Sequence, residues 1–287
     1  MTPSRLPVVP PAVPAVLVIG GGELGSAVAH RLVTSGLRVV IADLARPTCI
    51  RRRVCFAEAL VGGETQVEGV VARRVASPAE ARGLAATGAI AVLGVEAGGA
   101  DFARLAADLE ADVLIDARLL KRNQGISSGL APLVIGLGPG FRAPEDVHAV
   151  IETNRGHNLG RVILAGEAEA DTGQPGEIAG YSAERVIRAP SSGAFDSGKP
   201  LGTLVAKGEV VGRIGGVGGV GGAEVAAPIA GLLRGLVADG VEVECGRKIG
   251  DVDPRGAAID ITTISDKGRA VAGGVLEAIM HFWLKGG

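Results

Sequence analysis

The feature that most constrains the fold is a glycine triple between a buried strand and a helix. Residues 15–25 read Ala-Val-Leu-Val-Ile-Gly-Gly-Gly-Glu-Leu-Gly. In this spacing Gly20 permits a tight turn, Gly22 leaves bare backbone beside a ligand, and Gly25 lets the helix pack closely on the strand. The free N–H groups and the dipole at a helix start favour a negative charge. The spacing therefore predicts a phosphate-binding turn.

The residues that follow support this interpretation. A helical pattern ends at Ser35-Gly36, and the strand from Leu37 ends in Asp43, where a carboxylate can accept hydrogen bonds from a ribose. Arg46 is placed to meet a 2′-phosphate, so NAD and NADP both stay open. The alternative is a close-packed turn that binds nothing. The predicted cofactor-binding residues here are Gly20, Gly21, Gly22, Glu23, Leu24, Gly25 and Asp43.

Composition narrows the class of protein. The 287 residues are 47% hydrophobic but only 2% aromatic, so the cores consist of Val, Leu, Ile and Ala, which suits parallel sheets covered by helices. The formal charge of −2 argues against nucleic acid as a partner. Cys49, Cys55 and Cys245 are too few and too scattered for a disulfide framework or a metal site, which favours a reducing cytoplasm.

The chain divides into four segments. Residues 1–14 hold five prolines and are expected to be a flexible arm rather than a targeting peptide, and no stretch is long and apolar enough to predict a membrane span. Residues 15–184 alternate strand and helix patterns, which predicts a Rossmann-like, doubly wound α/β sheet with a nucleotide site. Residues 185–256 and 257–287 form the other two segments.

A second glycine loop follows the apolar run from Pro132 to Leu137. Its glycines are interpreted either as a second wall of the ligand crevice or as a structural turn, and they are Gly136, Gly138 and Gly140. Polar residues surround this loop. A histidine near a carboxylate suits general acid–base chemistry and a cation holds an anion, which makes candidates of His148, Glu152, Arg155, His157 and Lys121. The alternative is that these side chains are only solvated.

An internal repeat marks the third segment. Ala189-Pro190-Ser191-Ser192-Gly193 recurs as Ala227-Pro228-Ile229-Ala230-Gly231. Short strands and glycine turns of this kind resemble the all-β barrel-sandwich hybrid of biotinyl and lipoyl carriers. The hairpin at residues 215–222 holds no lysine, so neither biotin nor lipoate is expected, and the segment is interpreted as a structural or partner-docking module.

A C-terminal helix is predicted to begin at Ser265-Asp266. Its apolar stripe, which includes Val271, Val275 and Ile279, needs a surface to pack on. Either the first domain or another subunit of a homo-oligomer supplies that surface.

Several runs carry a resemblance to a known family. They are Ala-Val-Ile-Glu-Thr-Asn-Arg-Gly-His-Asn-Leu-Gly-Arg-Val-Ile at residues 149–163 and Pro-Gly-Glu-Ile-Ala-Gly-Tyr-Ser at residues 175–182, together with the strand and Arg-Pro-Thr around Asp43. The chain resembles the YqeB-like accessory proteins of the selenium-dependent molybdenum hydroxylase system, and its first domain is similar to XdhC-type factors. The first loop departs from the family pattern, since Gly-Gly-Gly-Glu stands where Gly-Ala-Gly-Asp is expected.

The resemblance implies a cytoplasmic helper in molybdenum cofactor maturation that contacts a molybdenum hydroxylase or its maturation machinery. Its ligand is then NAD(P) or another nucleotide, including a molybdopterin dinucleotide. The alternatives are an NAD(P)-dependent oxidoreductase and a non-catalytic scaffold. Whether the chain is an enzyme stays open at this point.

Overall fold

A large β-sheet organises the chain in the computed structural model, which describes residues 13–96, 101–171, 173, 176–215 and 222–285. In these residues nine strands run in the order β10-β9-β7-β6-β1-β2-β5-β4-β3. The pairs from β9 to β4 are parallel, whereas β10 and β3 add antiparallel edges. The strands are β1 Ala15–Ile19, β2 Arg38–Leu44, β3 Glu64–Val67, β4 Val70–Val75, β5 Ile90–Val95, β6 Val113–Asp116, β7 Leu133–Leu137, β9 Ala149–Ile151 and β10 Val162–Ile163.

Helices cover both faces of this sheet. Val16 and Val18 of β1 face the core formed with α1 (Glu23–Thr34) and α5 (Asp266–Lys285), because alternate strand residues point to opposite faces. Leu17 and Ile19 face the core formed with α3 (Pro78–Ala85) and α4 (Phe102–Asp108). A short helix, α2 (Ala59–Gly62), and the small hairpin of β8 (Arg142–Ala143) and β11 (Gly166–Glu167) complete this sheet lobe.

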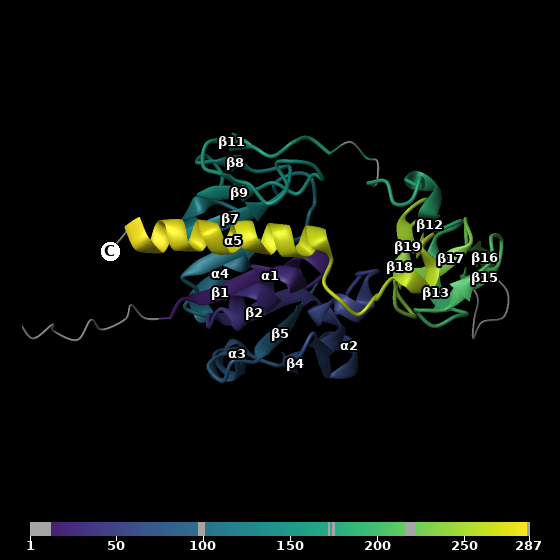
Figure 1. Cartoon of the computed structure of the whole chain (residues 1–287). Coiled ribbons are helices and arrows are strands. Elements are labelled where there is room, and N and C mark those ends of the chain that lie inside the picture. Colours follow the sequence, from purple (N-terminus) through teal and green to yellow (C-terminus); the bar gives the residue numbers. More distant parts are fainter. Residues whose placement is uncertain (1–12, 97–100, 172, 174–175, 216–221, 286–287) are drawn as a thin grey trace, which may run out of the picture.

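The remaining strands form a separate β lobe, at the right of Figure 1. In the described residues it holds two four-stranded antiparallel sheets, ordered β12-β19-β17-β14 and β16-β15-β13-β18. The strands are β12 Val186–Arg188, β13 Gly193–Ser197, β14 Leu204–Val205, β15 Val210–Ile214, β16 Ala223–Ala226, β17 Gly231–Leu236, β18 Glu242–Val243 and β19 Lys248–Asp253. The chain enters this lobe after β11 and returns through α5, so the β lobe is inserted in the sheet lobe.

The internal repeat is visible in the order of these strands. β13, β14 and β15 follow the first copy of the repeat, and β17, β18 and β19 follow the second. The two sheet orders are equivalent when β13, β14 and β15 are replaced by β17, β18 and β19 and the reverse, and when β12 and β16 are exchanged as well. Each sheet therefore takes its last strand, β14 or β18, from the other copy.

The predicted fold class, a Rossmann-like doubly wound sheet with a barrel-sandwich hybrid domain, is wrong. The main sheet is mixed, and the rest of the described chain forms several further sheets. The link between β3 and β4 is only Glu68-Gly69, with φ angles of 43° and 85°, and a two-residue turn forces antiparallel pairing. Most of the predicted arm (1–14) and of the predicted hairpin (215–222) lies outside the described residues.

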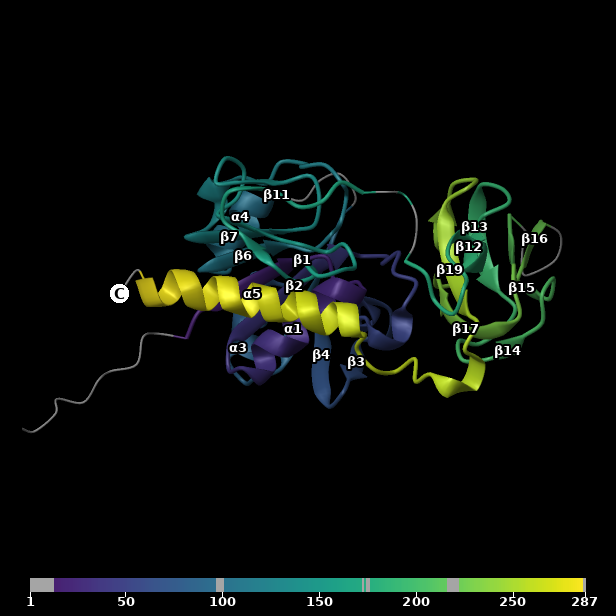
Figure 2. The same ribbon diagram turned by 45° about the horizontal axis from the view of Figure 1, so that its top comes forward.

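The C-terminal helix packs on the sheet lobe. Val271, Val275 and Ile279 are buried in the core shared with α1. A Cβ at Gly268 would lie 2.9 Å from the Cβ of Ala27, so the two helices approach each other too closely there for a side chain. Figures 1 and 2 show α5 beside α1, with its first turn toward the β lobe. No helix in the described part of the chain combines the length and apolarity needed to cross a membrane.

A buried carboxylate joins the two lobes. Asp251 on β19 is fully buried and accepts hydrogen bonds from Arg51, at 3.1 Å to each oxygen. Arg185 and Arg234 also donate to it, at 3.0 and 2.5 Å. Arg51 belongs to the segment after β2, so this pair connects the sheet lobe to the β lobe. Burial alone would raise the pKa of Asp251, but the charges of Arg51 and Arg234 outweigh this effect and hold the pKa at about 2.

The Asp251→Asn variant should lose about 3–5 kcal/mol of unfolding free energy at pH 7, because two buried arginines and the partly buried Arg51 lose their shared counter-charge. The folded pKa lies below the ordinary 3.8, so the stabilising effect of Asp251 is complete above about pH 4 and disappears as the pH falls through about 2. Urea unfolding across this range measures it. The exposed Asp196 supplies the control, and an Asp196→Asn variant as unstable as Asp251→Asn would contradict the expectation.

Candidate functional site

The glycine turn is held by contacts that require its glycines. Gly20 is buried with φ +97°, and a Cβ at Gly25 would collide with the Gly20 carbonyl oxygen. The Ser26 hydroxyl donates to the Gly21 carbonyl (2.8 Å) and accepts from the Phe56 amide (2.7 Å). The turn is therefore fixed on both sides before any ligand binds.

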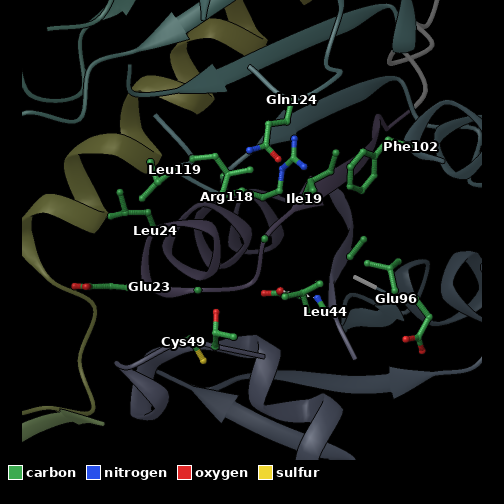
Figure 3. A pocket seen from close by; sticks show the side chains of 18 of the residues that line it. Ile19, Glu23, Leu24, Leu44, Cys49, Glu96, Phe102, Arg118, Leu119 and Gln124 are labelled. Atoms are coloured by element: carbon green, nitrogen blue, oxygen red, sulfur yellow. Dashed lines mark hydrogen bonds between the residues drawn. The ribbon is translucent and has the colours of Figure 1, made fainter. Parts of the chain in front are cut away.

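A cavity of about 670 Å³ opens at this turn. In Figure 3, Arg118, Leu119 and Gln124 lie along one side, opposite Leu44 and Cys49. Its exposed lining is more apolar than polar. The lining residues are Ile19, Gly20, Gly22, Glu23, Leu24, Ala42, Asp43, Leu44, Thr48, Cys49, Val95, Glu96, Phe102, Ala117, Arg118, Leu119, Leu120, Gln124 and Lys267.

Asp43 connects the end of β2 to the glycine turn. Its Oδ2 accepts from the Gly21 amide and its Oδ1 from the Leu44 amide, both at 2.7 Å. Burial raises the pKa of this carboxyl, while the two amides act in the opposite direction. A carboxylate oxygen has two lone pairs, so each oxygen keeps one for a ligand hydroxyl.

The charges at the cavity are unequally neutralised. Arg51 lies 3.8 Å from Glu23, and Arg118 pairs with Asp116 at 2.6 Å while its guanidinium lies over the Phe102 ring. Lys267, at the start of α5, has no ion-pair partner among the described residues, and burial lowers its pKa. Lys267 is thus the cation in this cavity that a bound anion can neutralise.

The second glycine loop packs inward. A Cβ at Gly136 would collide with the Phe141 ring, one at Gly138 would lie 2.6 Å from Thr153 Oγ1, and one at Gly140 would lie 2.5 Å from the Arg122 amide nitrogen. None of these three glycines lines the cavity at Gly20. The positions show the close packing of a structural turn.

His148 and Glu152 do not come together. His148 precedes β9, and its Nδ1 accepts from the Val134 amide at 3.0 Å. Glu152 follows β9, about 13 Å away along the strand. It is buried, and its oxygens accept from the amides of Asn154 (2.6 Å) and Glu169 (2.7 Å). Both side chains are used to hold the backbone.

The other three candidates lie elsewhere. Arg155 forms a two-point pair with Asp266 at 2.7 and 3.0 Å, and the hydrogen bonds from Arg155 lower the pKa of Asp266 to about 2. Lys121 Nζ lies 2.5 Å from Asp171 Oδ2. His157 is exposed, without a hydrogen bond or ion pair to the residues described. No group of three or more His, Cys, Asp or Glu in the described chain is arranged to hold a metal.

Sequence reasoning missed Arg118, Phe102 and Lys267 as cavity residues. Arg118 follows the end of β6, which pairs with β1, so its place at the carboxyl end of a strand was an available signal. Lys267 carried no such signal, because only the packing of α5 beside α1 brings it to the glycine turn.

Comparison with known proteins finds a curated relative of similar sequence. It is 46% identical over 271 residues, which is 94% of this chain, to the uncharacterized protein YqeB of Escherichia coli (strain K12). The chain is therefore YqeB-like over most of its length, but it spans about half (48%) of that relative. No family model matches.

Three solved structures each align with 84% of this chain, and the aligned part makes up 85% of the solved chain. They are the ectoine utilization protein EutE (DoeB) of Ruegeria pomeroyi (13% identical, TM-score 0.27), an aspartoacylase family protein of Mesorhizobium loti (11%, 0.28) and a succinylglutamate desuccinylase/aspartoacylase of Rhodobacter sphaeroides (17%, 0.27). At these scores we draw nothing about activity from the likeness.

The predicted description as a Rossmann, NAD(P)-binding protein is wrong, because the main sheet is mixed, with antiparallel pairs at β10 and β3. The solved structures above carry names of aspartoacylase and desuccinylase type.

Gly25 and Gly22 should respond differently to alanine. Gly25→Ala should lower the unfolding free energy by about 2 kcal/mol or more, because its Cβ collides with backbone. Gly22→Ala should cost no more than about 1 kcal/mol, since a Cβ there meets nothing within 4 Å. Urea unfolding of both variants tests the geometry, and equal losses would contradict it.

Proposed function

We propose that this YqeB-like chain binds a nucleotide that carries a pyrophosphate, in the cavity at Gly20–Gly25. The observation that carries the proposal is the pairing of two features in one cavity of about 670 Å³. One is a rigid turn at the start of α1, and the other is a partly buried carboxylate, Asp43, hydrogen-bonded directly to that turn.

The turn supports binding of the phosphate groups. The amides of Gly22, Glu23 and Leu24 begin a 12-residue helix and have no hydrogen-bond acceptor among the described residues. Such amides and the helix dipole favour an anion. Lys267 adds a positive charge from α5, and the repulsion from Glu23 is reduced by Arg51.

The rest of the cavity supports binding of a nucleoside. Asp43 offers one free lone pair on each oxygen to sugar hydroxyls. Beyond it, Leu44, Val95 and Phe102 line the cavity with apolar surface suited to a planar base. The order of phosphate turn, hydroxyl acceptor and apolar wall matches the order of groups in a nucleoside diphosphate.

The acid–base chemistry of an oxidoreductase receives no such support. Nδ1 of His148 and both carboxylate oxygens of Glu152 accept hydrogen bonds from backbone amides. The link to a selenium-dependent molybdenum hydroxylase, which the resemblance implies, stays a prediction, and so does a cytoplasmic location.

Purified full-length chain should melt at a higher temperature with at least one of ADP, GDP, CDP and UDP. A ligand at 100 times its Kd stabilises the folded state by about 2.7 kcal/mol. Gly22→Asp should abolish this rise, because its side chain enters open space beside the turn and carries a negative charge. Thermal-shift measurements at several ligand concentrations follow both effects.

The matched control is Gly83→Asp, the same change on an exposed position of α3 with nothing within 4 Å of its Cβ. It should keep the wild-type response. A melting temperature that none of the four nucleotides moves, or a full response in Gly22→Asp, would reject the proposal and leave the scaffold interpretation.

A further inference from the structure

A second cavity, of about 600 Å³, lies where the two lobes meet. The sheet lobe contributes Thr153 and Arg155, the β lobe contributes Arg188 and Lys248, and Lys267 enters from the first turn of α5. Its exposed lining is mainly polar, unlike that of the first cavity. Lys267 lines both cavities, so they are neighbours that share one wall.

Positive charge is in excess in this cavity. Its basic lining residues are Lys121, Arg155, Arg188, Lys248 and Lys267, against two acidic ones, Glu169 and Asp171. Lys121 is paired with Asp171, and Arg155 with Asp266. Glu169 accepts hydrogen bonds from the side-chain amides of Asn154 and Asn158, and it forms no ion pair with a residue that the structure describes.

Three cations are left over. Arg188, Lys248 and Lys267 have no ion-pair partner within the described ranges, although Arg188 donates to the Gly246 carbonyl at 3.0 Å. The residues between 171 and 176 whose positions are not described are Thr172, Gln174 and Pro175, none of which carries a carboxylate. No direct ion pair in the described ranges neutralises these three groups, although Asp251 acts on Lys248 and Glu23 acts on Lys267 from a greater distance.

The neighbouring cations make this excess unfavourable, although Arg188 and Lys248 are exposed and Lys267 is only partly buried. Desolvation lowers the pKa of Lys248, and the neighbouring Arg51 and Arg185 lower it further, while Asp251 opposes them. Desolvation also lowers the pKa of Lys267. An ammonium group close to other cations is stabilised by an anion that binds beside it.

We propose that this cavity is a second binding site, for a small molecule that carries a phosphate-class oxyanion held by Arg188, Lys248 and Lys267. A phosphate accepts from several donors at once, and charge-assisted hydrogen bonds of this kind are stronger than neutral ones. Thr153 and Asn154 also line the cavity and add polar groups to the same site. The proposal goes beyond nucleotide binding at the glycine turn and does not depend on it.

The site has contributions from both lobes. Val186, Arg188 and Lys248 lie on β12 and β19, whereas Thr153 and Arg155 follow β9. The lobes are fixed to each other nearby by the pair of Arg51 and Asp251. The backbone positions that carry the three cations are thus set before a ligand arrives, which reduces the entropy lost on binding.

Titration calorimetry of the full chain with inorganic pyrophosphate, in a chloride buffer, tests the proposal. Lys248→Gln and Arg188→Gln should each weaken binding about tenfold, the usual effect of removing one charged hydrogen bond. Lys207→Gln, at an exposed lysine outside both cavities, should bind as wild type does. Circular dichroism of each variant verifies that it is folded.

The glycine turn can also hold pyrophosphate, so Gly22→Asp serves as the second arm. Pyrophosphate binding that survives Gly22→Asp and falls in Lys248→Gln supports the second site. Binding that Gly22→Asp abolishes while Lys248→Gln and Arg188→Gln leave it intact overturns the second site without touching the first. An absence of any pyrophosphate binding to the wild-type chain also overturns it.

Discussion

The structure depends on one buried carboxylate, Asp251, and the arginines that surround it. Arg51 donates to it from the sheet lobe. Arg234 donates from β17 of the β lobe, and Arg185 donates from the turn just before β12. Arg234 also bonds Asp253, which bonds Arg255. A buried charge of this kind is tolerated only when its partners are complete, so the network fixes one relative placement of the lobes.

This placement determines the charges at both cavities. Arg51 donates to Asp251 and also lies 3.8 Å from Glu23 at the glycine turn. The same cluster of arginines lies close enough to Lys248 to lower its pKa. The junction of the lobes thus couples the electrostatics of the turn to that of the second cavity, although the residues involved are some two hundred positions apart in the chain.

The local elements were largely readable from the sequence. The strand from Ala15, the helix after Gly22 and the helix from Asp266 follow from hydrophobic period and glycine spacing, which are properties of short segments. The predicted fold class was wrong, because two loops set the direction of the edge strands. The two-residue turn between β3 and β4 and the polar loop between β9 and β10 both give antiparallel pairs. His148 and Glu152 were grouped because they are close in sequence, yet they lie at opposite ends of β9.

The sequence by itself determined the glycine turn at Gly20–Gly25, because the need for a missing Cβ is a local property of backbone geometry. It also placed Asp43 near the end of the neighbouring strand, which runs one residue further, to Leu44. Only the tertiary structure decided that Lys267 completes the first cavity and that Arg188 and Lys248 join it around the second. The physical reason is that both cavities are assembled by the return of α5 and the docking of an inserted lobe, which are long-range contacts that leave no periodic pattern in the chain.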